Sequence, residues 1–361
     1  MKILLLSPYD ALSHQYWWGK LCEGLSGHEF VVVTLQARYF SWRFRGNSLT
    51  LSQRHELSQA YDLVIATSMT DLATLKGLTP SLNGIPVILY FHENQFAYPD
   101  VSSANHQVER QITQLYSAIA ADQLVFNSSF NQRTFMEGVG DFLAKMPDGI
   151  PPGVVDGLSQ KARVIPVPIE IGRSGKKSSE NMSPSKQHGC DSRHIVWNHR
   201  WEHDKGVDEL DLLVDALISS GQRFTLSLIG QSFRKKPSKF KQLIARLDAV
   251  DALGRVGFIE DRNDYLAFLG QCDVVLSTAR HEFQGLAVLE AMAAGCVPIV
   301  PNALAYTEFV PEICRYDSTK QAVDMIREIK PGSSFSVNSL PASVSVSNVF
   351  RRWHDLVNSL L

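Results

Sequence analysis

The amino-acid sequence predicts an α/β fold made of two doubly wound domains that face each other across a cleft. Three observations support this fold class. The 361 residues suffice for two domains, since one domain commonly has about 100–200 residues. Short apolar runs without two-residue alternation recur in both halves, as is typical of strands buried on both faces of a parallel sheet. The segments between these runs are long enough for crossover helices.

The first domain is expected over residues 1–170. Its predicted strands are Lys2–Leu6, Phe30–Leu35, Leu63–Thr67, Pro86–Phe91 and Gln123–Asn127. Asn105–Ala121 has the length of a crossover helix.

A polar segment rich in Ser and Lys, residues 171–193, predicts a flexible linker, and a second domain follows over residues 194–335. The second domain's predicted strands are His194–Asn198, Phe224–Ile229, Arg255–Phe258, Asp273–Ser277 and Val297–Val300, with helices at Val207–Ser219 and Leu286–Ala294. Residues 336–361 form a tail in which Val346–Leu361 carries apolar side chains at helical spacing, as in an amphipathic helix packed on a domain.

Composition and charge exclude several classes of protein. A net charge of −2 excludes coating of nucleic acid by bulk charge but leaves room for a local basic patch. Five cysteines without a CxxC pair argue against a zinc cluster or disulfide scaffold and favour a reducing compartment. No apolar run approaches the roughly 18–20 residues that span a bilayer, and the first ten residues favour a buried strand over a signal peptide. We therefore expect a cytoplasmic protein with no membrane partner.

The strongest chemical motif is the segment from Ser277 to Val300. A strand ends near Ser277, a loop carries Glu282, and Gly285 permits close backbone approach before a helix begins. The first helical amides lack intrahelical partners and attract an anion. Glu282 and Glu290 would accept hydrogen bonds from hydroxyls of a sugar and a ribose. An ordinary strand–helix–strand unit with a capping Glu is the alternative.

A second motif follows the first strand of the second domain. Arg200 and Lys205 bracket a loop and are positioned to clamp two phosphates, and Gly206 permits a tight turn into a helix. The alternative is a solvated loop in which Arg200 pairs with Glu202 or Asp204. Both motifs lie at carboxyl ends of strands, and together they suit a nucleotide diphosphate sugar. No Asp-x-Asp follows a strand in a loop, so we expect the cations and helix dipole, rather than a metal, to balance the leaving-group charge.

Polar residues of the first domain form the predicted acceptor side. His92, Glu93, Asn94 and Gln95 directly follow a strand and would face the cleft. The alternative is that His92 caps the strand and Glu93 is a surface charge. The loop from Ser7 to His14 also follows a strand, so Ser13 and His14 would reach the cleft, unless Ser13 only caps the next helix.

Residues 38–45 interleave cations with aromatic side chains. Arg38, Arg43 and Arg45 would contact phosphates, while Trp42 or Phe44 would stack on an exposed base. The alternative is a segment whose aromatic rings seal the core. Residues 232–239 form a weaker basic stretch, which we interpret as a solvated loop.

The two second-domain motifs resemble the retaining GT-B glycosyltransferases of the glycosyltransferase-4 type. Residues 90–99, 125–128, 199–205 and 277–283 are more specifically similar to the tRNA-queuosine α-mannosyltransferase family. The resemblance implies two Rossmann-like domains, GDP-mannose as donor, the queuosine of tRNA-Asp as acceptor, retention of configuration and no cofactor. Relatives often have a Gly-Gly pair where this chain has Asp10-Ala11-Leu12.

The resemblance places His92 beside the donor sugar. We assign the catalytic roles to His92, Arg200, Lys205 and Glu282, and donor binding to Arg200, Lys205, Glu282, Phe283, Gly285, Leu286 and Glu290. Acceptor binding is assigned to Ser13, His14, Arg38, Trp42, Arg43, Arg45, Glu93, Asn94 and Gln95. No obligate protein partner is inferred. Two alternatives stay open: a GT-B enzyme acting on a lipid or small glycan, and a non-catalytic relative that only binds tRNA.

Overall fold

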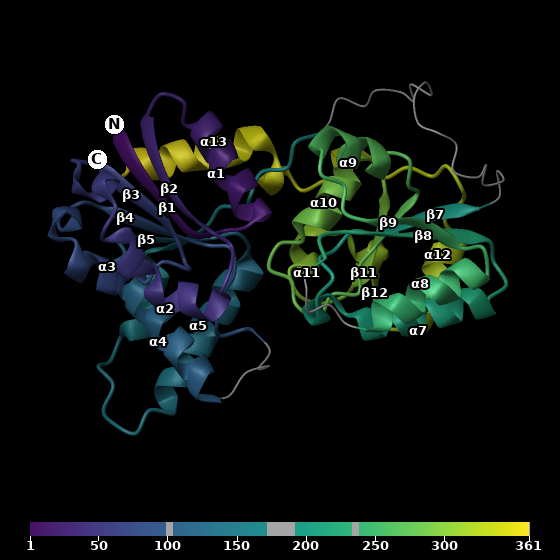
Figure 1. The fold of residues 1–361 in the computed structure, drawn as a ribbon, viewed down its shortest axis with the longest axis horizontal. Coiled ribbons are helices and arrows are strands. Elements are labelled where there is room, and N and C mark those ends of the chain that lie inside the picture. The colour runs from purple at the N-terminus through teal and green to yellow at the C-terminus, as the bar shows by residue number, and fades with distance from the viewer. Residues whose placement is uncertain (99–103, 172–191, 233–237, 361) are drawn as a thin grey trace. The chain divides into compact units, whose positions relative to one another are not determined.

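The computed structural model describes residues 1–98, 104–171, 192–232 and 238–360, and it divides into two compact units (Figure 1). Unit 1 comprises Met1–Pro168 together with Ser343–Leu361, and unit 2 comprises Ile169–Ala342. The predicted linker at 171–193 lies almost entirely outside the described residues, as does most of the basic stretch at 232–239. The expectation that the two domains face each other across a cleft stays a prediction.

Unit 1 is a six-stranded parallel sheet in the order β2-β1-β3-β4-β5-β6. Its strands are β1 (Lys2–Asp10), β2 (Glu29–Gln36), β3 (Leu63–Thr67), β4 (Val87–Phe91), β5 (Gln123–Phe126) and β6 (Ala162–Val164). Its helices are α1 (Leu12–Gly24), α2 (Phe40–Leu51), α3 (Leu72–Leu78), α4 (Ala104–Ala120), α5 (Ser129–Ala144), α6 (Val154–Gln160) and α13 (Val346–Asn358). All five predicted strands are present.

Two features of unit 1 differ from the prediction. β1 continues to Asp10 and α1 begins at Leu12, so the predicted loop from Ser7 to His14 is wrong. Pairing with β2 extends β1 beyond its apolar run, because backbone hydrogen bonds do not require apolar side chains. β6 was not predicted, since it has three residues and one of them is an exposed arginine.

Unit 2 is also a six-stranded parallel sheet, in the order β12-β11-β10-β7-β8-β9. Its strands are β7 (Arg193–Trp197), β8 (Phe224–Ile229), β9 (Leu253–Gly257), β10 (Val274–Leu276), β11 (Val297–Pro301) and β12 (Arg315–Tyr316). Its helices are α7 (Val207–Ser219), α8 (Lys239–Ala249), α9 (Arg262–Leu269), α10 (Leu286–Ala293), α11 (Tyr306–Phe309) and α12 (Thr319–Glu328). The five predicted strands are confirmed, and the two-residue β12 is an addition.

The strand order of unit 2 indicates where its sheet would bind a ligand. In unit 2 the chain starts at β7, builds outward through β8 and β9, and then returns to the other side of β7 with β10. This is the Rossmann order, in which ligands bind outside the carboxyl ends of the strands where the direction of winding reverses. We therefore expect a ligand of unit 2 to bind at the ends of β7 and β10, which carry both predicted donor motifs.

The core of unit 1 explains why its apolar runs become strands. Every residue of β3 and β4 is buried, because helices cover both faces of the sheet. The C-terminal helix α13, drawn in yellow in Figure 1, packs on this unit through Val349, Trp353, Leu356 and Val357. The predicted amphipathic helix is thus present, and it completes a core whose other elements come from the first half of the chain.

Trp353 is the largest of the side chains that α13 buries in this core. It is 2% exposed, and its ring centroid lies 6.4 Å from that of Trp17 and 5.8 Å from that of Tyr90. We expect Trp353→Ala to lower the free energy of unfolding by about 3–5 kcal/mol, because truncating a buried aromatic ring leaves a cavity. Denaturant unfolding measures this loss. The exposed neighbour His354 provides the control, since His354→Ala should change stability by less than about 0.5 kcal/mol. Equal effects of the two substitutions would contradict the packing of α13 described here.

Candidate active site

Two loops meet at the carboxyl ends of β7 and β10 in unit 2. The carbonyl oxygen of Asp204 accepts hydrogen bonds from the amides of Arg280 at 2.9 Å and His281 at 3.2 Å. The Thr278 hydroxyl donates to the carbonyl oxygen of Lys205 at 3.0 Å. A side chain at Gly206, whose φ is 70°, would overlap the carbonyl oxygen of Thr278. Glycine is therefore required here both by backbone conformation and by the close approach of the loops.

Lys205 joins these loops by charge. Its ammonium nitrogen lies 2.9 Å from the carbonyl oxygen of His281, 3.3 Å from Oε2 of Glu282 and 3.2 Å from Oδ2 of Asp204. The side chains of Lys205 and Glu282 are only 9% and 18% exposed. The role of Lys205 as a phosphate clamp stays a prediction, and in the structure its ammonium group balances two carboxylates.

Burial and ion pairing oppose each other at this pair. Burial raises the pKa of Glu282, but attraction to Lys205 and a hydrogen bond from its ammonium group outweigh burial and lower this pKa to about 2. Burial lowers the pKa of Lys205, whereas Glu282 and Asp204 raise it, and the net direction is upward. Both groups are therefore charged at neutral pH. Breaking such a buried pair by removing one partner leaves an uncompensated charge.

Two histidines that the sequence analysis did not single out border the ion pair. His199 and His281 are 3% and 4% exposed. Burial, followed by repulsion from Lys205, lowers the pKa of each to about 4, so both imidazoles are neutral at pH 7. A usable signal existed, since His199 directly precedes Arg200 and His281 directly precedes Glu282.

Arg200 is the accessible cation of the site. Its side chain is 44% exposed, and its guanidinium lies 3.1 Å from Oε2 of Glu202. The ion pair with Glu202 that we considered as an alternative is therefore present. An exposed pair of this kind is weak, so it does not prevent the guanidinium from binding a stronger anion.

Gly285 begins α10 in a left-handed conformation with a φ of 81°. A β-carbon at this position would lie 2.8 Å from the ring of Tyr306, whose hydroxyl is 2.7 Å from the hydroxyl of Ser277. Both the backbone conformation of Gly285 and the ring of Tyr306 therefore disfavour a side chain at this position. The first hydrogen bond of the helix runs from the amide of Leu289 to the carbonyl oxygen of Gly285 at 2.9 Å. Earlier amides, including that of Leu286, form the positive end of the helix.

Phe283 packs inside this loop. It is 5% exposed, and its ring meets that of His281 edge-on with centroids 4.6 Å apart. Its amide donates to Oε1 of Glu282 at 3.2 Å. Phe283 therefore helps to orient the carboxylate of Glu282, which is the contribution the structure assigns to this predicted donor residue.

Glu290 belongs to a second polar network. The guanidinium of Arg262 lies 2.8 Å from Oε1 of Glu290. Burial raises the pKa of Glu290, and the ion pair with Arg262 opposes this shift. The amide of Asn198 donates to the hydroxyl of Tyr265 at 3.0 Å and to the carbonyl oxygen of Ala287 at 2.8 Å. The network joins the ends of β7, α9 and α10, and its members other than Glu290 were not predicted, because they are distant in sequence.

In unit 1 the structure brings His14 and His92 together. Their rings stack with centroids 4.0 Å apart and an interplanar angle of 15°. Burial, followed by His14, lowers the pKa of His92 well below its usual value. Ser13 is exposed in the first turn of α1, whose N-cap is Ala11, so the capping alternative for Ser13 is wrong.

Asn94 does not face solvent. Its side-chain oxygen accepts hydrogen bonds from the amides of Phe96 at 3.0 Å and Ala97 at 2.9 Å, and its nitrogen donates to Oδ1 of Asn131 at 2.8 Å. The assignment of Asn94 to acceptor binding is therefore wrong, because its side chain is buried and its polar atoms bond to its own turn and to α5. Gln95 is 3% exposed, whereas Glu93 is partly buried.

The cationic segment of unit 1 forms the start of α2. Trp42 is 59% exposed and lies along the helix against Gly46, where a β-carbon would overlap its indole. Phe44 is 1% exposed, so the prediction that it stacks on a base is wrong. Arg45 lies 3.4 Å from Asp71 and donates to the hydroxyl of Thr113 at 2.8 Å.

The other two predicted arginines of this segment differ from Arg45. Arg38 is exposed and Arg43 is partly buried. Within the described residues neither of them pairs with a carboxylate. Arg110 of α4 adds a further cation, since its guanidinium lies over the ring of Phe40 at 5.2 Å and donates to the hydroxyl of Ser41 at 3.2 Å.

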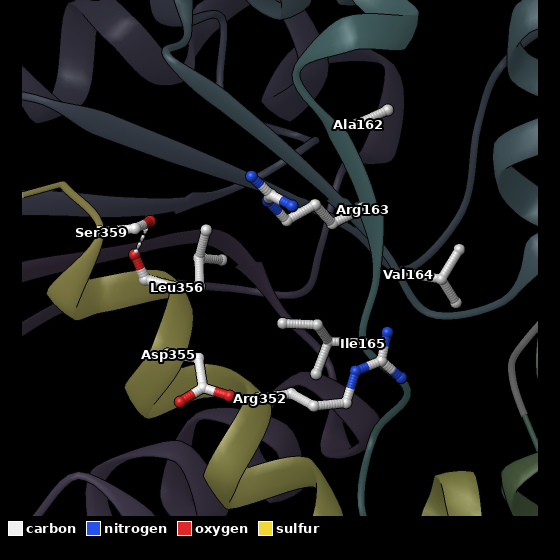
Figure 2. A pocket seen from close by; sticks show the side chains of 8 residues that line it. All are labelled: Ala162, Arg163, Val164, Ile165, Arg352, Asp355, Leu356 and Ser359. Atoms are coloured by element: carbon white, nitrogen blue, oxygen red, sulfur yellow. Dashed lines mark hydrogen bonds between the residues drawn. The ribbon is translucent and has the colours of Figure 1, made fainter.

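Unit 1 also contains a cavity of about 480 Å³ that none of the predicted residues lines. It lies between residues 162–165 and the C-terminal part of α13, and Figure 2 shows the side chains that line it. Arg163 extends from β6, while Arg352 and Asp355 extend from α13. The cavity is separate from the histidine stack and from the cationic part of α2, and we assign it no role.

Two further observations concern metals and membranes. Among the residues described, His, Cys, Asp and Glu side chains form no group of three or more that is placed to hold a metal ion. In the same ranges, no helix combines the length and apolar character needed to cross a membrane. The expectation of a metal-free reaction stays a prediction.

Solved structures share this architecture. Sucrose-phosphate synthase from Thermosynechococcus elongatus gives a TM-score of 0.72 at 14% identity, covering 100% of this chain and 99% of that one. Anabaena HepE in complex with UDP and glucose gives a TM-score of 0.68 at 16% identity, covering 99% and 100%. At such identities the likeness concerns the fold alone, and it confirms the predicted GT-B fold.

Sequence comparison identifies the family. Residues 2–169 match the family described as tRNA-queuosine alpha-mannosyltransferase N-terminal, and residues 178–312 match glycosyl transferases group 1. The tRNA-queuosine alpha-mannosyltransferase of Drosophila melanogaster is 34% identical over 322 residues, covering 88% of this chain and 84% of that protein. The GDP-mannose:cellobiosyl-diphosphopolyprenol alpha-mannosyltransferase of Xanthomonas campestris is 21% identical over 257 residues, covering 70% and 60%. The chain is a glycosyltransferase and belongs to the tRNA-queuosine α-mannosyltransferase family.

Proposed function

We propose that this enzyme transfers mannose from GDP-mannose to the queuosine of tRNA-Asp with retention of configuration, and that it acts in the cytoplasm. The observation that carries the donor side is the buried pair of Lys205 and Glu282 where the winding of the unit 2 sheet reverses. It places a fixed cation and a fixed acceptor at the position where α/β sheets bind nucleotides. The acceptor side follows from family membership.

The donor site is built for a diphosphate between two sugars. The guanidinium of Arg200 and the ammonium of Lys205 would meet the diphosphate, together with the first amides of α10. Glu282 would accept hydrogen bonds from the mannose, and Glu290 from the ribose. Burial raises the pKa of Glu290 and the ion pair with Arg262 opposes this shift, and its carboxylate oxygens are the groups that would accept the two vicinal hydroxyls.

The proposed chemistry is a front-face substitution at the anomeric carbon. The acceptor hydroxyl attacks from the face that GDP leaves, and a donor phosphate oxygen takes the hydroxyl proton. Negative charge develops on the departing diphosphate, where Arg200, Lys205 and the helix amides stabilise it. His92 would lie beside the mannose. No covalent enzyme intermediate is required.

The acceptor RNA would contact the start of α2. Arg38 and Arg43 supply positive charge for phosphates, and the exposed face of Trp42 supplies a surface for stacking a base. Trp42 is suited to this role because Gly46 lets its other face lie against the helix. Ser13, His14 and Glu93 remain candidates for contacts with the acceptor.

Two other functions are distinguished by one experiment. The Xanthomonas relative is named for a lipid-linked acceptor, and a non-catalytic tRNA binder is the other alternative. Mass spectrometry of tRNA nucleosides from cells with and without this protein tests all three. We expect mannosyl-queuosine to be lost when the protein is absent. Unchanged mannosyl-queuosine would overturn the proposed acceptor.

The cations of the donor site give the first activity prediction. Arg200→Ala and Lys205→Ala should each reduce kcat about 10²–10³-fold, the usual cost of removing one group that stabilises developing charge. Lys205→Ala should also lower the stability of the fold by about 3–5 kcal/mol, because Glu282 is left buried and unpaired. Steady-state kinetics and denaturant unfolding measure the two effects.

Arg280→Ala is the matched control for Arg200→Ala. Arg280 is 50% exposed, and its side chain pairs with Glu209 and Asp208 of α7 rather than with Glu282 or Glu290. We expect its substitution to leave kcat within about threefold of wild type. Near-normal turnover of Arg200→Ala or Lys205→Ala would remove that residue from the diphosphate site.

The second activity prediction concerns metals. Activity should survive EDTA, because organic cations and helix amides are expected to balance the leaving-group charge. The assay compares initial rates with and without EDTA, using enzyme freed of metal beforehand. A loss of activity that Mg²⁺ or Mn²⁺ restores would contradict the metal-free mechanism.

The third prediction concerns RNA. The double variant Arg38→Ala/Arg43→Ala should bind tRNA more weakly. A plot of the logarithm of the tRNA-binding constant against the logarithm of the salt concentration should have a slope smaller in magnitude by about 0.7–0.9 for each phosphate that the variant no longer neutralises. GDP-mannose binding should not change. Arg54→Ala, which removes an exposed arginine just beyond α2, is the control. If the double variant keeps the wild-type slope, this surface does not bind RNA.

A further inference from the structure

The stack of His14 on His92 packs against the aromatic core of unit 1, with His14 buried and His92 partly buried. Besides its parallel contact with His14, the ring of His92 meets the rings of Trp17 and Tyr90 edge-on. The centroid of the His92 ring lies 4.9 Å from that of Trp17 and 4.8 Å from that of Tyr90. Trp17 and Tyr90 stack on each other at 4.3 Å, and Trp353 of α13 lies behind them. Two rings from α1 and one from β4 therefore enclose one imidazole.

The enclosure fixes the orientation of His92. The carbonyl oxygen of His92 accepts a hydrogen bond from the side-chain amide of Asn127 at 2.9 Å, which holds its backbone. The hydroxyl of Tyr90 donates to the carbonyl oxygen of Ile165 at 3.0 Å, which holds the ring of Tyr90 in place. The backbone of His92 and the ring of Tyr90 are thus held by other contacts. The ring of His14 covers one face of the His92 imidazole, so a substitution of His14 changes the packing on that face.

The enclosure also disfavours a charge on His92. Nε2 of His92 is buried and has no hydrogen-bond partner among the described residues, so a proton there would be poorly solvated. The rings of His14 and His92 lie 4.0 Å apart, so a positive charge on one ring disfavours a positive charge on the other. The other ionisable group in contact, Tyr90, is neutral because burial raises its pKa well above 10.0.

We propose that His14 is a positioning residue, which by stacking holds the imidazole of His92 in one orientation and keeps it uncharged beside the donor sugar. This inference rests on the proposed function, in which His92 lies next to the mannose. Positive charge develops at the anomeric carbon in glycosyl transfer. An imidazolium next to that carbon would oppose the transition state, whereas a neutral, fixed imidazole can still exchange a hydrogen bond with a sugar hydroxyl.

Two substitutions separate stacking from charge. His14→Phe keeps an aromatic ring against His92 but removes the ionisable group, and His14→Ala removes both. We expect His14→Phe, which keeps the stacked ring, to lose less kcat than His14→Ala. His14→Ala should lower kcat about 10–100-fold with little change in KM for GDP-mannose, because the reacting groups are bound but misplaced. His55→Ala, at an exposed histidine of the same unit, is the control and should match wild type.

The charge on His92 is read without substrate. NMR titration of histidine labelled with ¹³C at Cε1, with His92 assigned from the spectrum of His92→Asn, gives the pKa of His92 in each protein. Removing a like charge favours the protonated form, so this pKa should be higher in His14→Phe than in wild type. The acid limb of the kcat profile should then move to higher pH in the same variant.

The outcomes are distinct. Equal losses of kcat in His14→Phe and His14→Ala would mean that His14 acts as a polar group. Unchanged kcat in both variants would mean that the stack is not needed. Either result overturns the proposal. An unchanged pKa of His92 in His14→Phe overturns its electrostatic part. If wild-type protein transfers no mannose to tRNA, the proposed function fails instead, and the titration still reports whether the two histidines are coupled.

Discussion

The buried ion pair between Lys205 and Glu282 is the interaction on which the proposed donor site depends. Neither charge is stable alone in its surroundings, and together they join the loops that follow β7 and β10. Because the Rossmann order brings these two strand ends together, residues 77 positions apart along the chain become neighbours. Burial is the main reason that His199 and His281 are neutral at pH 7, and the positive charge of Lys205 adds to this effect.

Glycine and aromatic residues make this arrangement sterically feasible. Gly206 allows the two loops to touch, and Gly285 turns the chain into α10 against the ring of Tyr306. In unit 1 the corresponding constraint is aromatic packing around His92, which α13 completes from the C-terminal end of the chain. A polar group is thus fixed by charge pairing in unit 2 and by ring stacking in unit 1.

Much of this organisation was predictable from the sequence because it is local. Apolar runs located ten of the strands, and helix-start glycines located the donor motifs. The short β6 and β12 were missed because pairing with a neighbour, rather than composition, makes them strands. Asn94 and Phe44 were misassigned because motif position does not reveal whether a side chain points inward. The partnership of Glu290 with Arg262 also depends on contacts between distant segments, which no local pattern encodes.

The donor site of unit 2 is proposed to support retaining transfer of mannose to queuosine, and this activity can be measured directly. The measurement uses purified protein with GDP-mannose labelled with ¹³C at the anomeric carbon and with tRNA that contains queuosine. Mass spectrometry of the digested tRNA and NMR of the labelled carbon should show one α-linked mannose on queuosine for each GDP released, and none on tRNA lacking queuosine. Release of GDP with mannose appearing only as free sugar, or a β-linked product, would contradict the proposed activity.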